Sequence, residues 1–409
     1  MNGPATAPTT APGKAPGTGI LIGLAVIAAL GSMAIHMLVP ALPAMAGQFA
    51  VSVGAAQLAV SIYMIALGGG QLVAGPAADR LGRRPVLIAG IALYVLGALI
   101  CAAAPVLWVL LIGRAIQASG GAAGVVTSRV LVGDIFGKER AAERQATLMM
   151  VILISPALAP VLGGFLAQGP GWRSIPLVLA AGGVIAATVV LRRLPTGATP
   201  VGRVEQRSLW QDARRVARNR QLALTALAMA GATSVLYMFL ANAVFLLVRD
   251  MGLTERDTGL CLLAIAAVSI FGTRLVRPVQ KRGCGLLAGT ALVLAGAGIE
   301  LAVELAGWHG PVALVAPMLL VGVGAGLAGP SAMAIIVFAE EGLAGTAASL
   351  AGAFQMLASA LCTMALGFVS PMTPLRLALA LVLAAAVSAT AAGLRWRLAT
   401  PARGLTPRA

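Results

Sequence analysis

Charged side chains are scarce in this 409-residue chain: Asp, Glu, Lys and Arg make up 10% of it, against about 25% in soluble domains. Only two histidines are present, so a histidine-built metal site is not expected. The cysteines have no ligand-like spacing, lie in or beside apolar runs, and are expected to pack as small apolar residues: Cys101, Cys261, Cys284 and Cys362. No nucleophile–base set, P-loop or cofactor motif occurs, so neither an enzyme nor an ATP-driven pump is indicated.

Apolar residues, by contrast, are abundant. They make up 59% of the chain, and the mean hydropathy is +0.95, which indicates an all-α integral membrane protein. Twelve apolar runs are long enough to cross a hydrocarbon core of about 30 Å. These predicted spans are 19–45, 54–76, 86–104, 107–134, 145–168, 174–191, 221–248, 258–277, 284–305, 311–338, 344–369 and 374–396.

The net charge of +16 is distributed unevenly between the two sides of the predicted bundle. Few basic residues lie on one side: Arg173, Arg249, Arg256 and Arg376. Most of the others lie on the side that holds both chain ends, so the positive-inside rule places both ends in the cytoplasm and the chain in the inner (plasma) membrane. No polar domain is large enough to carry a nucleic-acid-binding face. The positive charge is therefore attributed to the orientation of the chain in the membrane.

One long polar break divides the predicted spans into six plus six. Residues 192–220 form a basic cytoplasmic linker, which is either a short amphipathic helix on anionic lipid or a solvated connection. The lobes on either side are residues 19–191 and 221–396, as in folds made of two pseudo-symmetric halves. Residues 1–18, rich in Pro, Ala, Thr and Gly, are expected to be a disordered cytoplasmic tail, and residues 397–409 a second tail.

The stretch 75–87, which reads G-P-A-A-D-R-L-G-R-R-P-V-L, is the most informative part of the chain. Asp79, Arg80, Arg83 and Arg84 lie here between two apolar runs. Charges this dense cannot remain in hydrocarbon, so the segment must be a short loop at the water boundary. It is either a charge cluster with a specific role or only an anchor that sets the topology.

Three further stretches stand out: H-M-L-V-P-A-L-P at 36–43, R-A-I-Q-A-S-G-G-A-A at 114–123 and S-P-A-L-A-P-V-L-G-G at 155–164. With the 75–87 loop, they resemble the major facilitator superfamily, specifically its Bcr/CflA drug:proton antiporter branch. The resemblance covers most of residues 19–395. It implies a two-lobed fold that alternates between inward and outward openings and exchanges small amphipathic antibiotics for protons, without a cofactor.

Two titratable groups are predicted to couple transport to protons. Arg114 lies near the middle of an apolar helix, where an unpaired charge costs about 2.5–3.5 kcal/mol or more, so it should face a wet cavity or a partner. The resemblance links this arginine to proton coupling; the alternative is a structural ion pair. His36 stands where relatives commonly carry Asp, and a free imidazole titrates near about pH 6.5. Alternatively, His36 is a polar packing residue.

A second set of residues is predicted to gate the passage. By the resemblance, Asp79, Arg83 and Asp134 form a cytoplasmic charge cluster, and Asp79 faces the start of the eleventh span. The Pro- and Gly-containing fifth span would control closure between the lobes; simple small-residue packing is the alternative. The predicted gating residues are Asp79, Arg80, Arg83, Arg84, Asp134, Pro156, Pro160, Gly163 and Gly164.

Methionine, aromatic and small polar side chains are expected to line the substrate passage, since they adapt to varied shapes. The candidates are Met33, Met37, Tyr63, Gln117, Tyr237, Phe239, Asn242 and Gln355. Glu300 and Glu304 either face water at the outer end of the ninth span or line the cavity, where they would favour cations. The predicted function is proton-coupled drug efflux by a monomer. A carrier of one metabolite and a non-transporting membrane sensor are the alternatives.

Overall fold

The computed structural model describes residues 18–193, 214, 218–276, 279, 284–338, 344–369 and 372–399. Across this described part the secondary structure is helical, without strands. Eleven helices are long and apolar enough to cross a membrane. The predicted tails, 1–18 and 397–409, and the predicted linker, 192–220, lie almost wholly outside the described residues.

Two sets of helices follow one another along the chain. The first set is α1 (Thr18–His36), η1 (Val39–Ala41), α2 (Leu42–Gln48), α3 (Val53–Leu81), α4 (Arg83–Ala103), α5 (Leu107–Gln168) and α6 (Ser174–Arg193). The second set is α8 (Arg220–Phe245), the π-helical segment η2 (Leu246–Asp250), α9 (Glu255–Arg274), α11 (Gly285–Leu305), α12 (Pro311–Phe338), α13 (Ala344–Gly367) and α14 (Pro374–Ala399).

Local sequence chemistry explains several of these boundaries. Ser52 and Thr254 cap α3 and α9, each side chain accepting a hydrogen bond from an amide of the first turn. Gly82 separates α3 from α4 with φ +93°, a conformation that side chains disfavour. Helix α1 ends at His36, four residues before Pro40, whose ring removes a backbone donor and would clash with the carbonyl of residue 36. The predicted first span therefore breaks at His36.

Helix α5 is helical through residues 135–144, where the sequence predicted a break between two spans. A straight helix of 62 residues would separate its ends by roughly 93 Å. However, Ala104, just before α5, accepts a hydrogen bond of 2.8 Å from Nη2 of Arg173, just after it. Helix α5 must therefore fold back on itself and cross the bilayer twice. With the other spans, this makes twelve crossings, as predicted.

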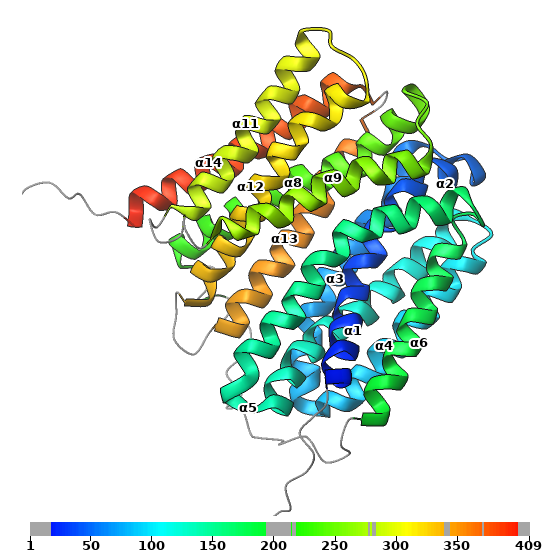
Figure 1. Cartoon of the computed structure of the whole chain (residues 1–409), viewed down its shortest axis with the longest axis vertical. Coiled ribbons are helices and arrows are strands. Elements are labelled where there is room, and N and C mark those ends of the chain that lie inside the picture. The colour runs from blue at the N-terminus through cyan, green and yellow to red at the C-terminus, as the bar shows by residue number, and fades with distance from the viewer. Residues whose placement is uncertain are drawn as a thin grey trace, which may run out of the picture.

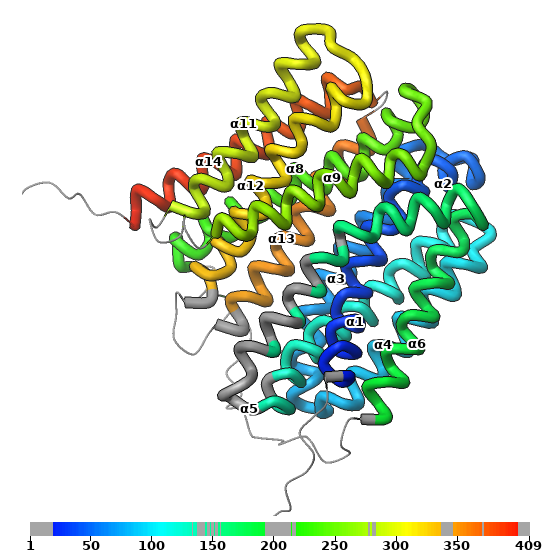
Figure 2. Tube along the Cα trace, in the orientation of Figure 1, coloured from blue at the N-terminus to red at the C-terminus, as the bar shows by residue number. Residues whose placement is uncertain are grey.

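The helices form two lobes that follow the order of the chain. Figure 1 shows α1, α4 and α6 in one lobe and α8, α11, α12 and α14 in the other, and the colour gradient in Figure 2 separates the first half of the chain from the second. The most extensive contacts between the lobes are those of α3 with α13 and of α5 with α9. We call the end where α2 lies and α3 and α9 begin the α2 end, and the opposite end the Arg83 end.

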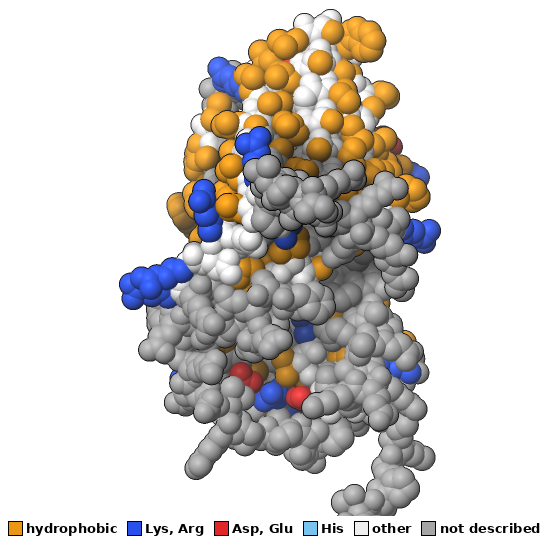
Figure 3. All heavy atoms as spheres, turned by 90° about the vertical axis from the view of Figure 1, so that its left-hand side faces the viewer, with side chains coloured by type: hydrophobic (Ala, Val, Ile, Leu, Met, Phe, Trp, Pro, Cys, Tyr) orange, Lys and Arg blue, Asp and Glu red, His pale blue; other side chains and the backbone are white. Residues whose placement is uncertain are grey.

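The outer surface is apolar, as expected of helices in contact with lipid. Large hydrophobic side chains such as Trp108, Val312 and Leu383 are exposed. Figure 3 shows hydrophobic side chains covering the upper part of one face, over the lobe formed by the second half of the chain. An exposed apolar belt of this kind would aggregate in water, so the structure confirms an all-α membrane protein.

Candidate functional site

A cavity of about 270 Å³ lies between the two lobes. Helices α1 and α5 contribute to its wall from the first lobe, and α8, α9, α12 and α13 from the second. Two of the predicted passage residues, Tyr237 and Gln355, line it together with His36, which was predicted to couple transport to protons. Most of the other lining residues are Ala, Leu, Ile and Pro, with a few Ser and Thr hydroxyls. Such a wall binds apolar bodies and offers few fixed polar contacts.

His36 is held at the junction of the two lobes by one contact on each side. Its Nδ1 lies 2.9 Å from the carbonyl oxygen of Ser32, one turn earlier in α1. Its ring lies 5.7 Å, centroid to centroid, from that of Tyr237 in α8. Among the described lining residues, His36 and Tyr237 are the titratable ones, and no Asp, Glu, Lys or Arg belongs to that set. The imidazole is therefore the one basic side chain among the described residues of this wall.

Arg114 is buried inside the first lobe, away from the central cavity. Its Nε donates to the carbonyl oxygen of Ala59 at 3.0 Å, and its Nη1 donates to Oε1 of Gln117 at 2.9 Å. The guanidinium carbon lies 3.9 Å from the centroid of the Tyr63 ring, in cation–π geometry. A void of about 10 Å³, room for about one water, adjoins Arg114 and Gln117. The arginine thus has polar partners and does not face lipid.

Six of the predicted passage residues, including the Gln117 that bonds to Arg114, lie outside the described wall of the central cavity. Met37 and Phe239 are fully buried in the core, and Met33 packs against it. Tyr63 donates its hydroxyl to the carbonyl oxygen of Gly31 at 2.9 Å. Asn242 takes part in a contact between the lobes.

That contact involves Gln57, which the sequence analysis did not single out. The amide nitrogen of Gln57 in α3 donates to Oδ1 of Asn242 at 2.8 Å and to the carbonyl oxygen of Ala241 at 3.1 Å, both in α8. These are buried bonds between lobes, near the α2 end. The only signal in the sequence is one amide within an apolar run, one turn after Gly54. The contact itself depends on a residue 185 positions away.

Two glycines allow α5 and α9 to approach closely at the same end. A Cβ on Gly164 would lie 2.5 Å from the carbonyl oxygen of Glu255, and one on Gly259 would lie 2.6 Å from that of Pro160. We call these two contacts the glycine seam. Gly163, the neighbouring predicted gating residue, packs instead against the backbone of Met37 within the first lobe. Pro156 is helical, and its side chain lies outside the described part.

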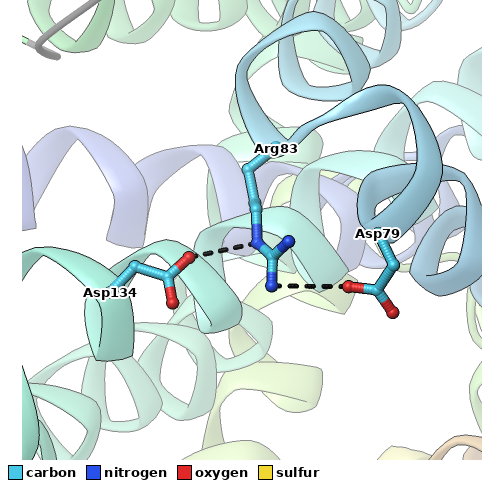
Figure 4. Close-up of polar contacts among 3 residues, drawn as sticks. All are labelled: Asp79, Arg83 and Asp134. Carbon is cyan, nitrogen blue, oxygen red and sulfur yellow. Dashed lines mark ion pairs between the residues drawn. The ribbon is translucent and has the colours of Figure 1, made fainter. Parts of the chain in front are cut away.

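At the Arg83 end, three helices meet in a charge cluster (Figure 4). Nη2 of Arg83 at the start of α4 lies 3.4 Å from Oδ1 of Asp79 in α3, and its Nε lies 3.1 Å from Oδ2 of Asp134 in α5. Arg80 is exposed and Arg84 is half-buried. The structure therefore brings together three of the predicted gating residues. The start of α13, which Asp79 was predicted to face, has no described side chains to test that contact.

Replacing Asp79 by Asn should separate a gating role from a stabilising one. The Asp79 carboxylate is about half exposed, so losing its ion pair should lower the free energy of unfolding by at most about 1 kcal/mol. If the cluster helps to close this end, transport by Asp79→Asn should fall about tenfold or more while the amount of inserted protein stays constant. Transport in proteoliposomes and thermal unfolding measure the two effects. Unchanged transport would remove Asp79 from the gate.

No group of three His, Cys, Asp or Glu side chains in the described part could hold a metal ion. Its four cysteines are unpaired.

Comparison with known proteins agrees with this fold. Residues 24–363 match the profile of the Major Facilitator Superfamily. The chain is 29% identical over 346 residues to multidrug resistance protein D of Escherichia coli K12, covering 83% of this chain and 86% of that protein. It is 30% identical over 299 residues to a chloramphenicol resistance protein of Pseudomonas aeruginosa, covering 72% of this chain and 71% of that protein.

Solved structures show the same fold at low identity. A D-xylose–proton symporter superposes with a TM-score of 0.73 at 14% identity, covering 93% of this chain and 97% of that one. A bacterial homologue of the lysosomal transporter Spinster superposes with a TM-score of 0.72 at 15% identity, covering 92% and 95%. The profile spans most of the chain and the two-lobed architecture is shared, so this chain belongs to the major facilitator superfamily.

Proposed function

We propose that this chain is a proton-coupled antiporter that expels small amphipathic drugs by alternating access. The observation that carries the proposal is the central cavity, which lies between the lobes and has a largely apolar wall. Such a wall binds amphipathic solutes of varied shape, because few polar groups dictate one orientation. The relatives named for multidrug and chloramphenicol resistance support this substrate class.

The two ends of the bundle would alternate as gates. The Gln57–Asn242 bond and the glycine seam would seal the α2 end, and the Asp79–Arg83–Asp134 cluster would help to close the Arg83 end. Rocking of one rigid lobe against the other would break one set of contacts as it forms the other. We place the Arg83 end and both termini in the cytoplasm of a bacterium, the chain in the inner membrane, and the active form as a monomer.

His36 is the proposed proton carrier of the cavity. It lies on the cavity wall between the two lobes, so a change in its charge would alter both the cavity and its contact with Tyr237. Arg114 would act from inside the first lobe by holding α3 and α5 together through Ala59 and Tyr63. Binding of the drug in the cavity and binding of a proton to its wall then compete with each other. Such competition is required for the exchange of drug for protons.

Replacing His36 by Ala tests this role. If the imidazole carries the proton, drug efflux by His36→Ala in proteoliposomes should vary less than about twofold between about pH 5.5 and 8, whereas the wild type should vary much more. Asp257→Asn is the matched control, because it removes an exposed titratable group at the start of α9 that lies outside the cavity wall. If His36→Ala keeps the wild-type pH profile, another group carries the proton.

Everted membrane vesicles with an acidified interior provide the direct test of function. Adding dissimilar drugs and dyes should discharge the proton gradient, and the discharge should require this protein. A carrier of one metabolite would instead respond to a single solute and leave the drugs without effect. A sensor would produce no solute flux. Either of the last two results would overturn the proposal.

A further inference from the structure

A second and larger cavity, of about 450 Å³, lies at the α2 end within the second lobe. It shares no lining residue with the central cavity. Its wall is formed by η2 and the residue after it, by the end of α11, by the α11–α12 connection, and by the starts of α12 and α14. We call it the acidic pocket, because Asp250, Glu300 and Glu304 line it, and its described wall contains neither Lys nor Arg.

Glu300 is the residue that marks the acidic pocket as a binding site. Its side chain is only 3% exposed, and its Oε2 has no hydrogen-bond partner among the described residues. A buried carboxylate oxygen without a partner is costly and calls for a ligand or another explanation, and this is the only carboxylate oxygen of the described residues in that state. Glu304, one turn later, instead has a neighbour: its Oε2 lies 3.6 Å from Nδ1 of His309.

The rest of the wall is apolar. Trp308 is 71% exposed, and Met251 and Leu314 also line the acidic pocket. An exposed indole next to carboxylates can stack on a cation, and aliphatic side chains can cover an apolar body. No three His, Cys, Asp or Glu side chains in the described part are arranged to hold a metal ion, which favours an organic cation.

We propose that the acidic pocket binds an organic ammonium group attached to an apolar body, with the ammonium donating to Glu300. An amphipathic amine from solution and the ethanolamine headgroup of a membrane lipid share this chemistry. In either case the ligand supplies the donor that Glu300 lacks, and Asp250 and Glu304 add to the attraction. The site is separate from the central cavity, so it does not depend on the function proposed above.

The test uses the full chain in phosphatidylcholine nanodiscs with dansylcadaverine, a fluorescent primary amine. Binding should appear as energy transfer from tryptophan to the dansyl group. Energy transfer from Trp308, which lines the acidic pocket, reports binding in that pocket. Glu300→Gln should weaken this binding about tenfold or more, since it removes a charge-assisted bond. Asp257→Asn, which neutralises an exposed carboxylate at the same end outside the pocket, is the control and should bind as wild type.

Two further measurements keep the test decisive if Glu300→Gln folds poorly. Ala313→Phe would fill the acidic pocket without changing its charge and should also abolish this binding component. Dansylamide, which has the fluorophore but no amine, should not bind there. Equal binding of both probes, or wild-type binding by both pocket variants, would overturn the proposal.

A second nanodisc preparation identifies the source of the ammonium. If a lipid headgroup is the natural occupant, phosphatidylethanolamine in the disc should suppress dansylcadaverine binding to the wild type and have no effect on Glu300→Gln. If free amines are the natural occupants, binding should be the same in both lipids. Both results support an ammonium site.

Discussion

Arg114→Ala should abolish drug efflux and lower the free energy of unfolding by about 3 kcal/mol. The substitution removes the donors to Ala59 and Gln117 and leaves both oxygens buried without those partners. It also removes the cation that stacks on Tyr63. Because these contacts join α3 to α5, their loss should loosen the first lobe at its centre.

Arg114→Lys separates shape from charge at the same position. An ammonium cannot present the planar fork that reaches Ala59 and Gln117 together, so transport should still fall about tenfold or more. Arg220→Lys, at the exposed first residue of α8, is the matched control and should behave as wild type. Efflux in proteoliposomes and thermal unfolding are the measurements. Full activity in Arg114→Lys would show that only the charge matters.

Gly164→Ala should have a comparable effect on transport through a single methyl group. The new Cβ would lie 2.5 Å from the carbonyl oxygen of Glu255, where ordinary contact begins at 3.4 Å. A backbone oxygen cannot swing away as a side chain can, so α5 and α9 must separate by about 1 Å. This cost should exceed the roughly 1 kcal/mol that Ala gains over Gly in a helix. The α2 end should then fail to close, and efflux should fall by about a hundredfold.

Failure of the α2 end to close can be detected directly by labelling. Ala157→Cys places a thiol on the wall of the central cavity, and a membrane-impermeant maleimide added from the α2 side should label it faster in Gly164→Ala than in the parent. The native cysteines are first replaced by Ser. Gly298→Ala is the matched control, because nothing lies within 4 Å of a Cβ built there. If labelling and efflux do not change, the glycine seam is not a gate.

Several features of the fold could be predicted along the chain because they depend on neighbouring residues. Apolar runs of membrane length predicted the spans, and Pro40 explains why α1 ends at His36. The dense charges between residues 79 and 84 predicted a loop over 75–87, but α3 continues to Leu81 and α4 begins at Arg83, so the turn is confined to Gly82 with its positive φ. The helical conformation of residues 135–144 was not predicted, since polar residues there indicate water but do not exclude helical conformation.

In the candidate site, too, some features could be predicted from the sequence and others could not. His36 and Arg114 were identifiable because a titratable group within an apolar run is costly wherever it points. The sequence could not show that His36 faces the central cavity while Arg114 is enclosed in the first lobe, nor that Asn242 bonds to Gln57. For Glu300, it left open whether the carboxylate faces water or a cavity.

By itself, the sequence determined that this protein is a helical membrane protein with two sets of spans, because hydrophobic length and charge placement act on each segment separately. Only the tertiary structure decided which polar groups meet, which of them line the central cavity and which remain unpartnered, as Glu300 does. The bond between Gln57 and Asn242, for example, joins residues 185 positions apart, and its geometry depends on how the helices of the two lobes pack together.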